Sequence, residues 1–148
     1  MTPNKLLSEG LTVLTTIDPA SQAASTVTSG WVSAANHLAF LALVQTGVLG
    51  ASATLDAKIE QATTSGGAGA KAITGKAITQ IVKATGDNKQ ALINFKCADL
   101  DTEGGFSFVR VSLTVGTAAS IVGAVLLGGA PRYEPANSFN QAAVAQIV

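Results

Sequence analysis

The stretch that decides the fold is FSFVRVSLTV, residues 106–115. Apolar and polar residues alternate along it, which predicts a β-strand with one buried face and one solvated face. The apolar set is Val109, Val111, Leu113 and Val115, and the opposite set is Arg110, Ser112 and Thr114.

Similar runs lie on both sides of this strand. ATLDAKIEQ (53–61) and QALINFKC (90–97) alternate in the same way, whereas HLAFLALVQT (37–46) and SIVGAVLL (120–127) are apolar on both faces, as central strands are. Glycine-bearing gaps separate the runs, and no long amphipathic helix lies between them, so a parallel α/β sheet is not expected. The pattern predicts an all-β antiparallel sandwich or barrel.

A short repeat inside this region predicts an irregular strand. KAIT at 71–74 recurs at 76–79, and a step of five would place Ile73 and Ile78 on opposite faces of a straight strand. Gly75 lies between the two copies. We expect a bulge at Gly75 that restores the register.

Composition limits the classes of partner. The 148 residues correspond to about one domain, and 12% of them are charged, against about 25% in typical domains. Nine basic and nine acidic residues cancel, so no field attracts nucleic acid or anionic lipid. No run is long enough to span a membrane, and the single Cys97 fits a reducing compartment. The composition suits a surface that lies against other protein.

The two ends differ from the middle of the chain. Residues 1–30 are rich in Thr, Ser and Ala and are predicted to form an extended N-terminal arm, residues 31–130 the sandwich, and residues 131–148 a C-terminal tail. The arm either gains order on contact with a partner or folds back on the sandwich, and the sequence leaves both open. The last ten residues could form one short helix with Phe139, Ala143 and Ile147 on one side.

Catalytic and cofactor-binding patterns are weak. DLDTEGG (99–105) matches the start of a calcium loop, but Arg110 stands where the bidentate carboxylate belongs, so we predict a turn. GAGAKAITGKAIT has the wrong glycine spacing for a phosphate loop. His37 is the only histidine and Cys97 alternates in phase with apolar neighbours, so both are interpreted as structural. No enzyme activity, metal or cofactor is expected.

Four residues are candidates for contacts with a partner. Trp, Tyr and Arg are enriched at interface hot spots, and Arg132 and Tyr133 lie on a proline-flanked segment, APRYEP. Trp31 is a third candidate, although it could equally cap the core. Phe139, in the tail, is the fourth.

The run ALINFKCADLDTEGGFSFVRVSLTVGTAASIVGAVLLGGAPRYEP, with TLDAKIEQATTSGGAGAKAITGKAITQI upstream, resembles the cement or decoration proteins of tailed bacteriophages. The similarity covers about residues 30–135. It implies an antiparallel jelly-roll β-sandwich that binds the outside of an icosahedral head and stabilises contacts between major capsid subunits. It also implies self-association, with a dimer favoured over a trimer.

The resemblance implies a virion protein made in the host cytoplasm, with no nucleic acid or membrane partner. Two alternatives stay open. One is a neck or tail component of the same kind of particle, and the other is a sugar- or receptor-binding β-sandwich module. The small number of aromatic residues, 5% of the chain, counts against the latter.

Overall fold

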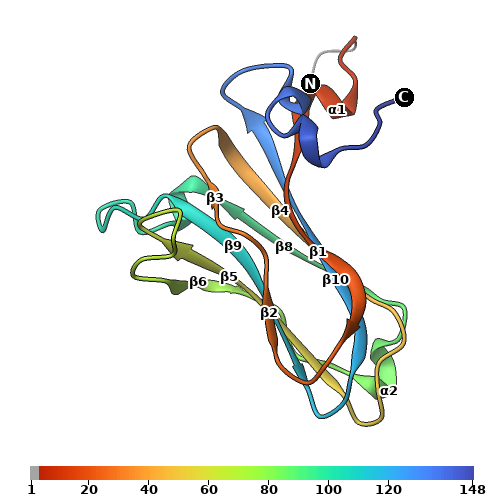
Figure 1. The fold of residues 1–148 in the computed structure, drawn as a ribbon. Coiled ribbons are helices and arrows are strands. Elements are labelled where there is room, and N and C mark those ends of the chain that lie inside the picture. The colour runs from red at the N-terminus through yellow and green to blue at the C-terminus, as the bar shows by residue number, and fades with distance from the viewer. Residues whose placement is uncertain (1–3) are drawn as a thin grey trace.

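The computed structural model describes residues 4–148. Two antiparallel sheets form a sandwich, with both ends of the chain at the same end of it (Figure 1). The elements are α1 (Leu7–Gly10), β1 (Leu11–Gln22), β2 (Thr26–Thr28), β3 (Val32–Ser33), β4 (His37–Thr46), β5 (Thr54–Ala62), β6 (Lys71–Ala77), β7 (Ile81–Val82), α2 (Lys83–Gly86), β8 (Gln90–Lys96), β9 (Phe108–Gly116) and β10 (Ser120–Pro131). Three short 3₁₀ helices cover Cys97–Asp99, Ala136–Ser138 and Gln141–Ala143.

The strand pairing is that of a jelly roll. One sheet has the order β1-β10-β4-β8 and the other β2-β9-β5-β6, with the short β3 and β7 added to the latter. Apart from those two short strands, the first strand pairs with the last, the second with the second last, and so on inward to β5 with β6. This nested pairing makes two facing sheets from one folded ribbon, and it confirms the all-β antiparallel fold expected from the sequence.

The core lies between the two sheets and is built from the alternating runs. The deciding stretch forms β9, where Val109, Val111, Leu113 and Val115 are each at most 2% exposed. Leu55 and Ile59 come from β5, which pairs with β9, and Phe40 comes from β4 in the facing sheet. The Phe40 ring stacks on Phe95 at 4.8 Å between centroids. Both runs that are apolar on two faces, β4 and β10, are central strands, as predicted.

Most of the segment predicted to be an N-terminal arm belongs to the sandwich. Residues 11–22 form β1, an edge strand that pairs antiparallel with β10, so the folded-back alternative describes this segment. Register shifts between Val13 and Thr15 and between Ile17 and Ala20 interrupt its pairing. Pro19 lies in the second shift, where a strand tolerates a residue without an N–H donor.

Gly75 lies at a bulge, as the five-residue repeat predicts. Between the pairs Lys58↔Ala77 and Glu60↔Ala72, β6 contains more residues than β5. Gly75 adopts φ +75°, a region that favours glycine. As a result both isoleucines of the repeat face the core: Ile73 is 3% exposed, and Ile78 packs against the core from its edge.

The C-terminal tail does not form the single helix that was predicted. Within the last ten residues only the 3₁₀ helix Gln141–Ala143 forms, and a second 3₁₀ helix, Ala136–Ser138, precedes them. A helix of about ten residues is marginal on its own because so few residues do not offset the entropic cost of forming its first turn. Here side-chain and backbone contacts with β1 and β4 fix the segment instead, as described below.

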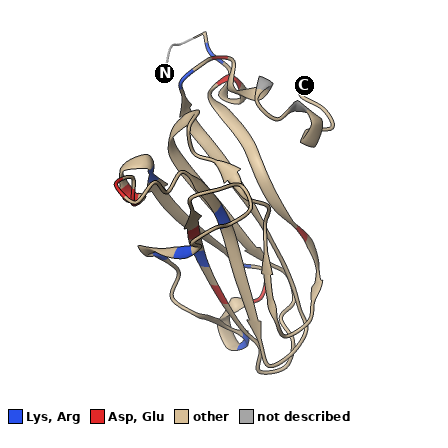
Figure 2. Ribbon diagram, turned by 60° about the vertical axis from the view of Figure 1, so that its left-hand side comes forward, with Lys and Arg blue, Asp and Glu red and all other residues tan. Residues whose placement is uncertain are grey.

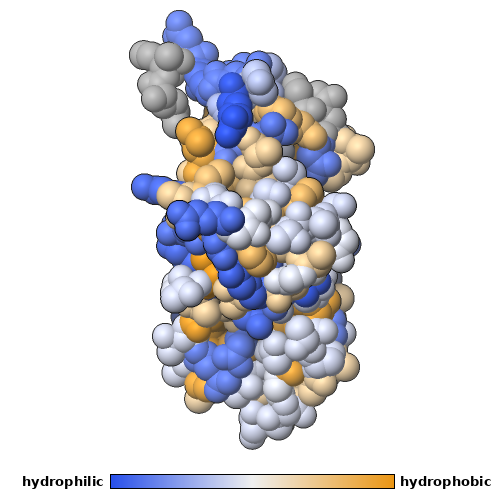
Figure 3. Space-filling view, turned by 90° about the vertical axis from the view of Figure 1, so that its left-hand side faces the viewer, coloured by the Kyte–Doolittle hydropathy of each residue, from blue (hydrophilic) through white to orange (hydrophobic). Residues whose placement is uncertain are grey.

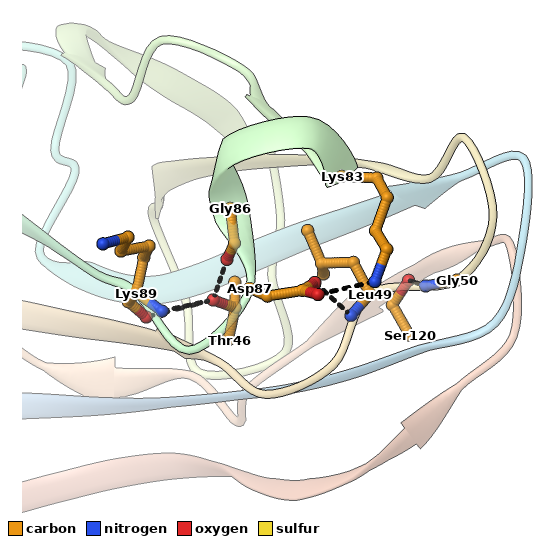
Figure 4. A network of polar contacts seen from close by, with 8 residues as sticks. All are labelled: Thr46, Leu49, Gly50, Lys83, Gly86, Asp87, Lys89 and Ser120. Carbon is orange, nitrogen blue, oxygen red and sulfur yellow. Dashed lines mark hydrogen bonds and ion pairs between the residues drawn. The ribbon is translucent and has the colours of Figure 1, made fainter.

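The end of the sandwich opposite the termini is closed by polar contacts (Figure 4). Asp87 accepts a hydrogen bond from the Leu49 N–H at 2.9 Å and from Lys83 Nζ at 2.6 Å. Thr46 Oγ1 donates to the Gly86 carbonyl at 2.5 Å and accepts from the Lys89 N–H at 2.9 Å. The loops after β4 and α2 are thereby joined.

Candidate partner-binding surfaces

Charged side chains are distributed unequally between the two sheets. In Figure 2 the blue and red residues gather on the strands and loops of the β2-β9-β5-β6 sheet, while the long strands of the other sheet are almost entirely tan. Figure 3, which faces the side where β6 lies in Figure 1, shows hydrophilic residues across the middle of the molecule. The two outer faces therefore suit different surroundings.

The charged face is held together by its own ion pairs. Arg110 on β9 contacts Glu60 on β5 at 2.7 Å, and Lys58 contacts the same carboxylate at 3.1 Å. Burial raises the pKa of Glu60, but the hydrogen bonds from Arg110 and Lys58 outweigh it, and the net pKa is lowered. The Arg110 guanidinium lies 4.4 Å from the centre of the Trp31 ring.

Trp31 is engaged by its own chain on two sides. Besides Arg110, it contacts the β5–β6 loop at Gly67, where an added Cβ would lie 2.5 Å from Trp31 Nε1. Gly67 has φ +86°, so the close approach and the backbone both favour glycine there. Trp31 is partly exposed, and its role as a partner contact stays a prediction.

The end of the sandwich that carries the two termini is organised around His37. Its Nε2 lies 3.1 Å from Thr12 Oγ1, and Thr12 donates to the Ala136 carbonyl at 2.5 Å. Because the Thr12 hydrogen is used in that bond, His37 Nε2 carries the donating proton and Nδ1 is bare. Nδ1 is buried and has no hydrogen-bond partner among the described residues.

Aromatic contacts complete the surroundings of His37. Phe139 packs edge-on against the imidazole at 5.3 Å between centroids, and Phe40 does so at 6.2 Å. His37 is 1% exposed, and burial lowers its pKa. A neutral imidazole therefore joins β1, β4 and the tail, as the structural interpretation of His37 expected. Phe139 itself is 36% exposed.

Further contacts bind the tail and the N-terminal segment to each other. Asn140 Nδ2 donates to the Val13 carbonyl at 2.7 Å, along the free edge of β1. Lys5 forms an ion pair with Glu134. These contacts protect part of an edge strand from pairing with another chain, and they hold the segment at Lys5 and the tail as far as Asn140 on the body of the protein.

Exposed apolar side chains gather beside these contacts and form what we call the terminal groove. It has a volume of about 390 Å³ and is lined by Lys5, Leu6, Leu7, Gly10, Leu11, Leu38, Gly129, Ala130, Pro131 and Glu134. Leu6, Leu7 and Leu38 are 68%, 63% and 55% exposed. Leucines this exposed at one place indicate a contact surface.

Arg132 and Tyr133 follow directly after this groove. The Arg132 N–H donates to the Asn36 carbonyl at 2.9 Å, which fixes the backbone, while both side chains are exposed. Tyr133 is 69% exposed. Two of the four candidate contact residues thus adjoin the terminal groove, Phe139 packs on His37, and Trp31 lies on the charged sheet. Leu6, Leu7 and Leu38 were not identified from the sequence.

The DLDTEGG stretch is a turn, and its carboxylates are used locally. Asp99 accepts from the Lys96 N–H at 2.7 Å, which lowers its pKa, and Asp101 contacts Lys71 Nζ at 2.6 Å, which lowers the pKa of Asp101. Asp101 also accepts from the Gly104 N–H at 2.9 Å. The turn links β8 in one sheet to β9 in the other.

Cys97 has the surroundings of a structural thiol. Its Sγ lies 2.8 Å from the His37 carbonyl oxygen and 3.4 Å from that of Ala34, to which it can donate. Burial raises its pKa, so the thiol rather than the more reactive thiolate is favoured. Within residues 4–148, no three His, Cys, Asp or Glu side chains converge as metal ligands do. None of the helices there is long and apolar enough to cross a bilayer.

The outer face of the β1-β10-β4-β8 sheet is the second apolar surface, and we call it the apolar sheet face. Its large side chains are Leu41 and Leu43 from β4, Leu92 from β8, and Ile121, Val125 and Leu127 from β10. Leu92 and Ile121 are 59% and 44% exposed, and the other four are only partly covered. A groove of about 410 Å³ crosses it between β1 and β4.

Comparison with known proteins gives matches among solved structures only. No family model and no curated protein matches the chain. It is similar to a chain of the infectious bursal disease virus VP2 subviral particle at 13% identity, with a TM-score of 0.49, over 85% of this chain and 34% of that one. It is also similar to a chain of cowpea mosaic virus empty virus-like particles at 8% identity, with a TM-score of 0.41, over 89% and 84% of the two chains.

A third neighbour is the Gx strain of infectious bursal disease virus, at 11% identity and a TM-score of 0.47, over 86% of this chain and 35% of that one. The chain thus spans about a third of the length of the bursal disease virus chains. All three neighbours come from virus particles. The jelly-roll assignment itself rests on the strand pairing of this chain.

Proposed function

We propose that the protein is a structural component of a virus particle, namely a cement protein that binds the outer surface of a tailed-bacteriophage head and stabilises contacts between major capsid subunits. Its role is to bind protein rather than to catalyse a reaction. The observation that carries the proposal is the terminal groove, where exposed leucines from α1 and β4 meet beside Tyr133.

The groove suits a contact with a large assembly. Its leucines offer apolar area that a partner can bury at about 25 cal/mol per Å². Tyr133 adds an aromatic ring with a polar tip, the type of side chain enriched at interface hot spots. The ion pair Lys5–Glu134 and the hydrogen bond from Thr12 to Ala136 hold the two chain ends in place, so little ordering entropy opposes binding.

Repetition explains how such a small groove could hold a protein on a head. A cement protein bound at symmetry-related positions that touches neighbouring subunits gains from high effective concentration once the first contact is made. Each individual contact can then be weak. We place the major capsid protein at the terminal groove, and we place this protein on the virion exterior.

The test is co-sedimentation of the purified protein with expanded and precursor heads of its own phage, with copies counted per capsid subunit. Saturable binding at a fixed ratio to expanded heads is expected. Leu38→Ser should lower the bound fraction at least tenfold. The matched control is Val48→Ser, which changes a valine of equal exposure, 55%, in the loop after β4 at the far end.

Equal loss of binding in Leu38→Ser and Val48→Ser would reject the terminal groove as the contact. Absence of wild-type binding to any head would reject the cement role and favour a neck or tail position.

A further inference from the structure

We propose that the apolar sheet face is the interface between two copies of this chain, related by a two-fold axis. This interface is separate from the proposed contact with the capsid, because it forms between two copies of the chain and uses a different surface. It rests on the charge distribution, the shape and the size of that face.

The apolar sheet face is nearly without charge. Of the outward positions along β1, β10, β4 and β8, charged residues occur only at Asp18 and Lys96. The remaining outward residues are aliphatic, glycine, proline, serine, threonine, glutamine or asparagine. Covering such a face desolvates almost no charge, and burial of unpaired charge is the main cost that prevents polar surfaces from associating.

The chemistry of the face selects a second copy as its occupant. The other sheet of the molecule carries charged side chains paired with one another, such as Arg110 with Glu60, so it is a poor match for an uncharged surface. An identical uncharged face is a good match. A two-fold contact places the same surface on both sides of the interface, and a face without charge is complementary to itself.

The two charged residues also fit a symmetric contact. Asp18 lies on the β1 edge, close to the level of Val44, whereas Lys96 lies on the β8 edge and pairs with Ala39, at the other end of β4. They therefore occupy diagonally opposite corners of the face. A two-fold axis that lies in the interface and is perpendicular to the line from Asp18 to Lys96 brings each Asp18 to the partner's Lys96, and it makes the strands of the two sheets cross at a steep angle, as in orthogonal sheet packings.

The face is large enough for a dimer of modest stability. Four strands about 4.8 Å apart give a width of roughly 19 Å, and the ten residues of β4 at about 3.3 Å each give a length of roughly 33 Å. The whole face thus measures roughly 600 Å² in plan, and two copies whose strands cross steeply overlap over roughly 400 Å². This overlap is about half of the ~800 Å² of accessible surface that each partner buries in an interface of standard size, so we expect a dimer that dissociates on dilution.

The groove makes the apolar sheet face uneven, with ridges that fit hollows. The β1 segment at Ile17–Pro19 overlies Gly123, where an added Cβ would lie 3.1 Å from the Ile17 carbonyl oxygen and the Pro19 Cα. This segment forms one wall, and Leu43 and Ile121 line the groove. Ridges beside hollows let the side chains of two copies interdigitate, as they do in the core between stacked sheets.

The test is sedimentation velocity of the full chain in the absence of heads, over a range of concentrations. A species of twice the 14.8 kDa chain mass is expected. Leu92→Asp should weaken the dimer by a hundredfold or more in Kd, because a two-fold contact contains the substitution twice. The control is Val82→Asp, which changes a 41% exposed valine on the other sheet. Both variants should keep the wild-type circular dichroism spectrum.

Charge reversal tests the symmetry directly. Asp18→Lys alone should weaken the dimer, and adding Lys96→Asp should restore it. A wild-type monomer, a trimer, or a dimer that survives Leu92→Asp would overturn the proposal. If the wild type is a monomer and Leu92→Asp abolishes head binding, the occupant is the capsid protein and not a second copy. The dimer is measured without heads, so this result stands or falls separately from the cement role.

Discussion

Gly128→Ala should destabilise the terminal end of the sandwich, because His37 leaves no space for a methyl group. An added Cβ at Gly128 would lie 2.7 Å from both Cδ2 and Cγ of His37. The imidazole cannot move aside freely, since it is held by Thr12 and packed by Phe139. Insertion of a methyl group into a packed site costs about 1–3 kcal/mol, which for a chain of this size corresponds to a fall in Tm of roughly 2–12 °C.

The neighbouring Gly129→Ala is the matched control. An added Cβ there meets nothing closer than Leu11 Cδ2 at 3.5 Å, which is ordinary contact. Removing a glycine at a site without strain stabilises a protein by about 0.4–1 kcal/mol, so Gly129→Ala should unfold at the same or higher urea concentration than wild type. If Gly128→Ala and Gly129→Ala have the same unfolding midpoint, His37 is not fixed as described here.

Three further predictions concern Tyr133, His37 and Arg110. Tyr133→Ala should leave Tm within about 2 °C of wild type, since Tyr133 is 69% exposed, yet weaken head binding; a large fall in Tm would place Tyr133 in the fold. Burial lowers the pKa of His37 below 6.5, so the unfolded chain binds the proton more readily, and this stability is lost as pH falls from 6.5 towards the folded pKa. The urea concentration at the midpoint of unfolding should therefore be lower at about pH 5 than at about pH 7.5, and His37→Gln should remove most of that difference. Equal midpoints at the two pH values in the wild type would contradict this prediction. Arg110→Ala should shift the fluorescence emission of Trp31, the only tryptophan, to longer wavelength, and it should lower the free energy of unfolding in urea by about 1–3 kcal/mol. The control Lys58→Ala, whose side chain is 45% exposed, should lower it by under about 1 kcal/mol. An unshifted emission spectrum would mean that Arg110 does not cover the indole.

The strands that alternate strictly were predictable from the sequence, because each has one face in the core. The bulge at Gly75 was predictable too, since only an irregular strand can turn both isoleucines of the repeat inward. Strand β1 was not recognised: two register shifts and Pro19 break its alternation, and its Thr and Ser residues resemble those of a flexible arm. Its pairing with β10, far along the chain, decides its structure.

The two exposed apolar surfaces could not be predicted from the sequence, for a different reason. The run HLAFLALVQT was interpreted as a central strand because both of its faces are apolar, and β4 is central. Its second face, however, is not covered by the rest of the chain, as Leu41 and Leu43 remain partly exposed. The periodicity of a sequence predicts that one face of a strand is apolar, but it does not predict which part of the protein, or which partner, covers that face. A signal was present at Leu92, the one apolar residue on the otherwise polar face of β8.

The nested pairing of the jelly roll determines when the protein can fold during its synthesis. β1 ends at Gln22, but its partner β10 ends at Pro131, so at roughly 5–20 residues per second the ribosome needs on the order of 5–20 s to supply that partner. Throughout this interval β1 has no native neighbour, and contacts this distant in sequence form slowly. The sheet that carries the apolar sheet face is therefore completed last, and crowded polysomes expose its aliphatic strands to one another. Lower temperature and slower expression should raise the soluble yield of this chain more than they would for a protein whose strands pair with their immediate neighbours.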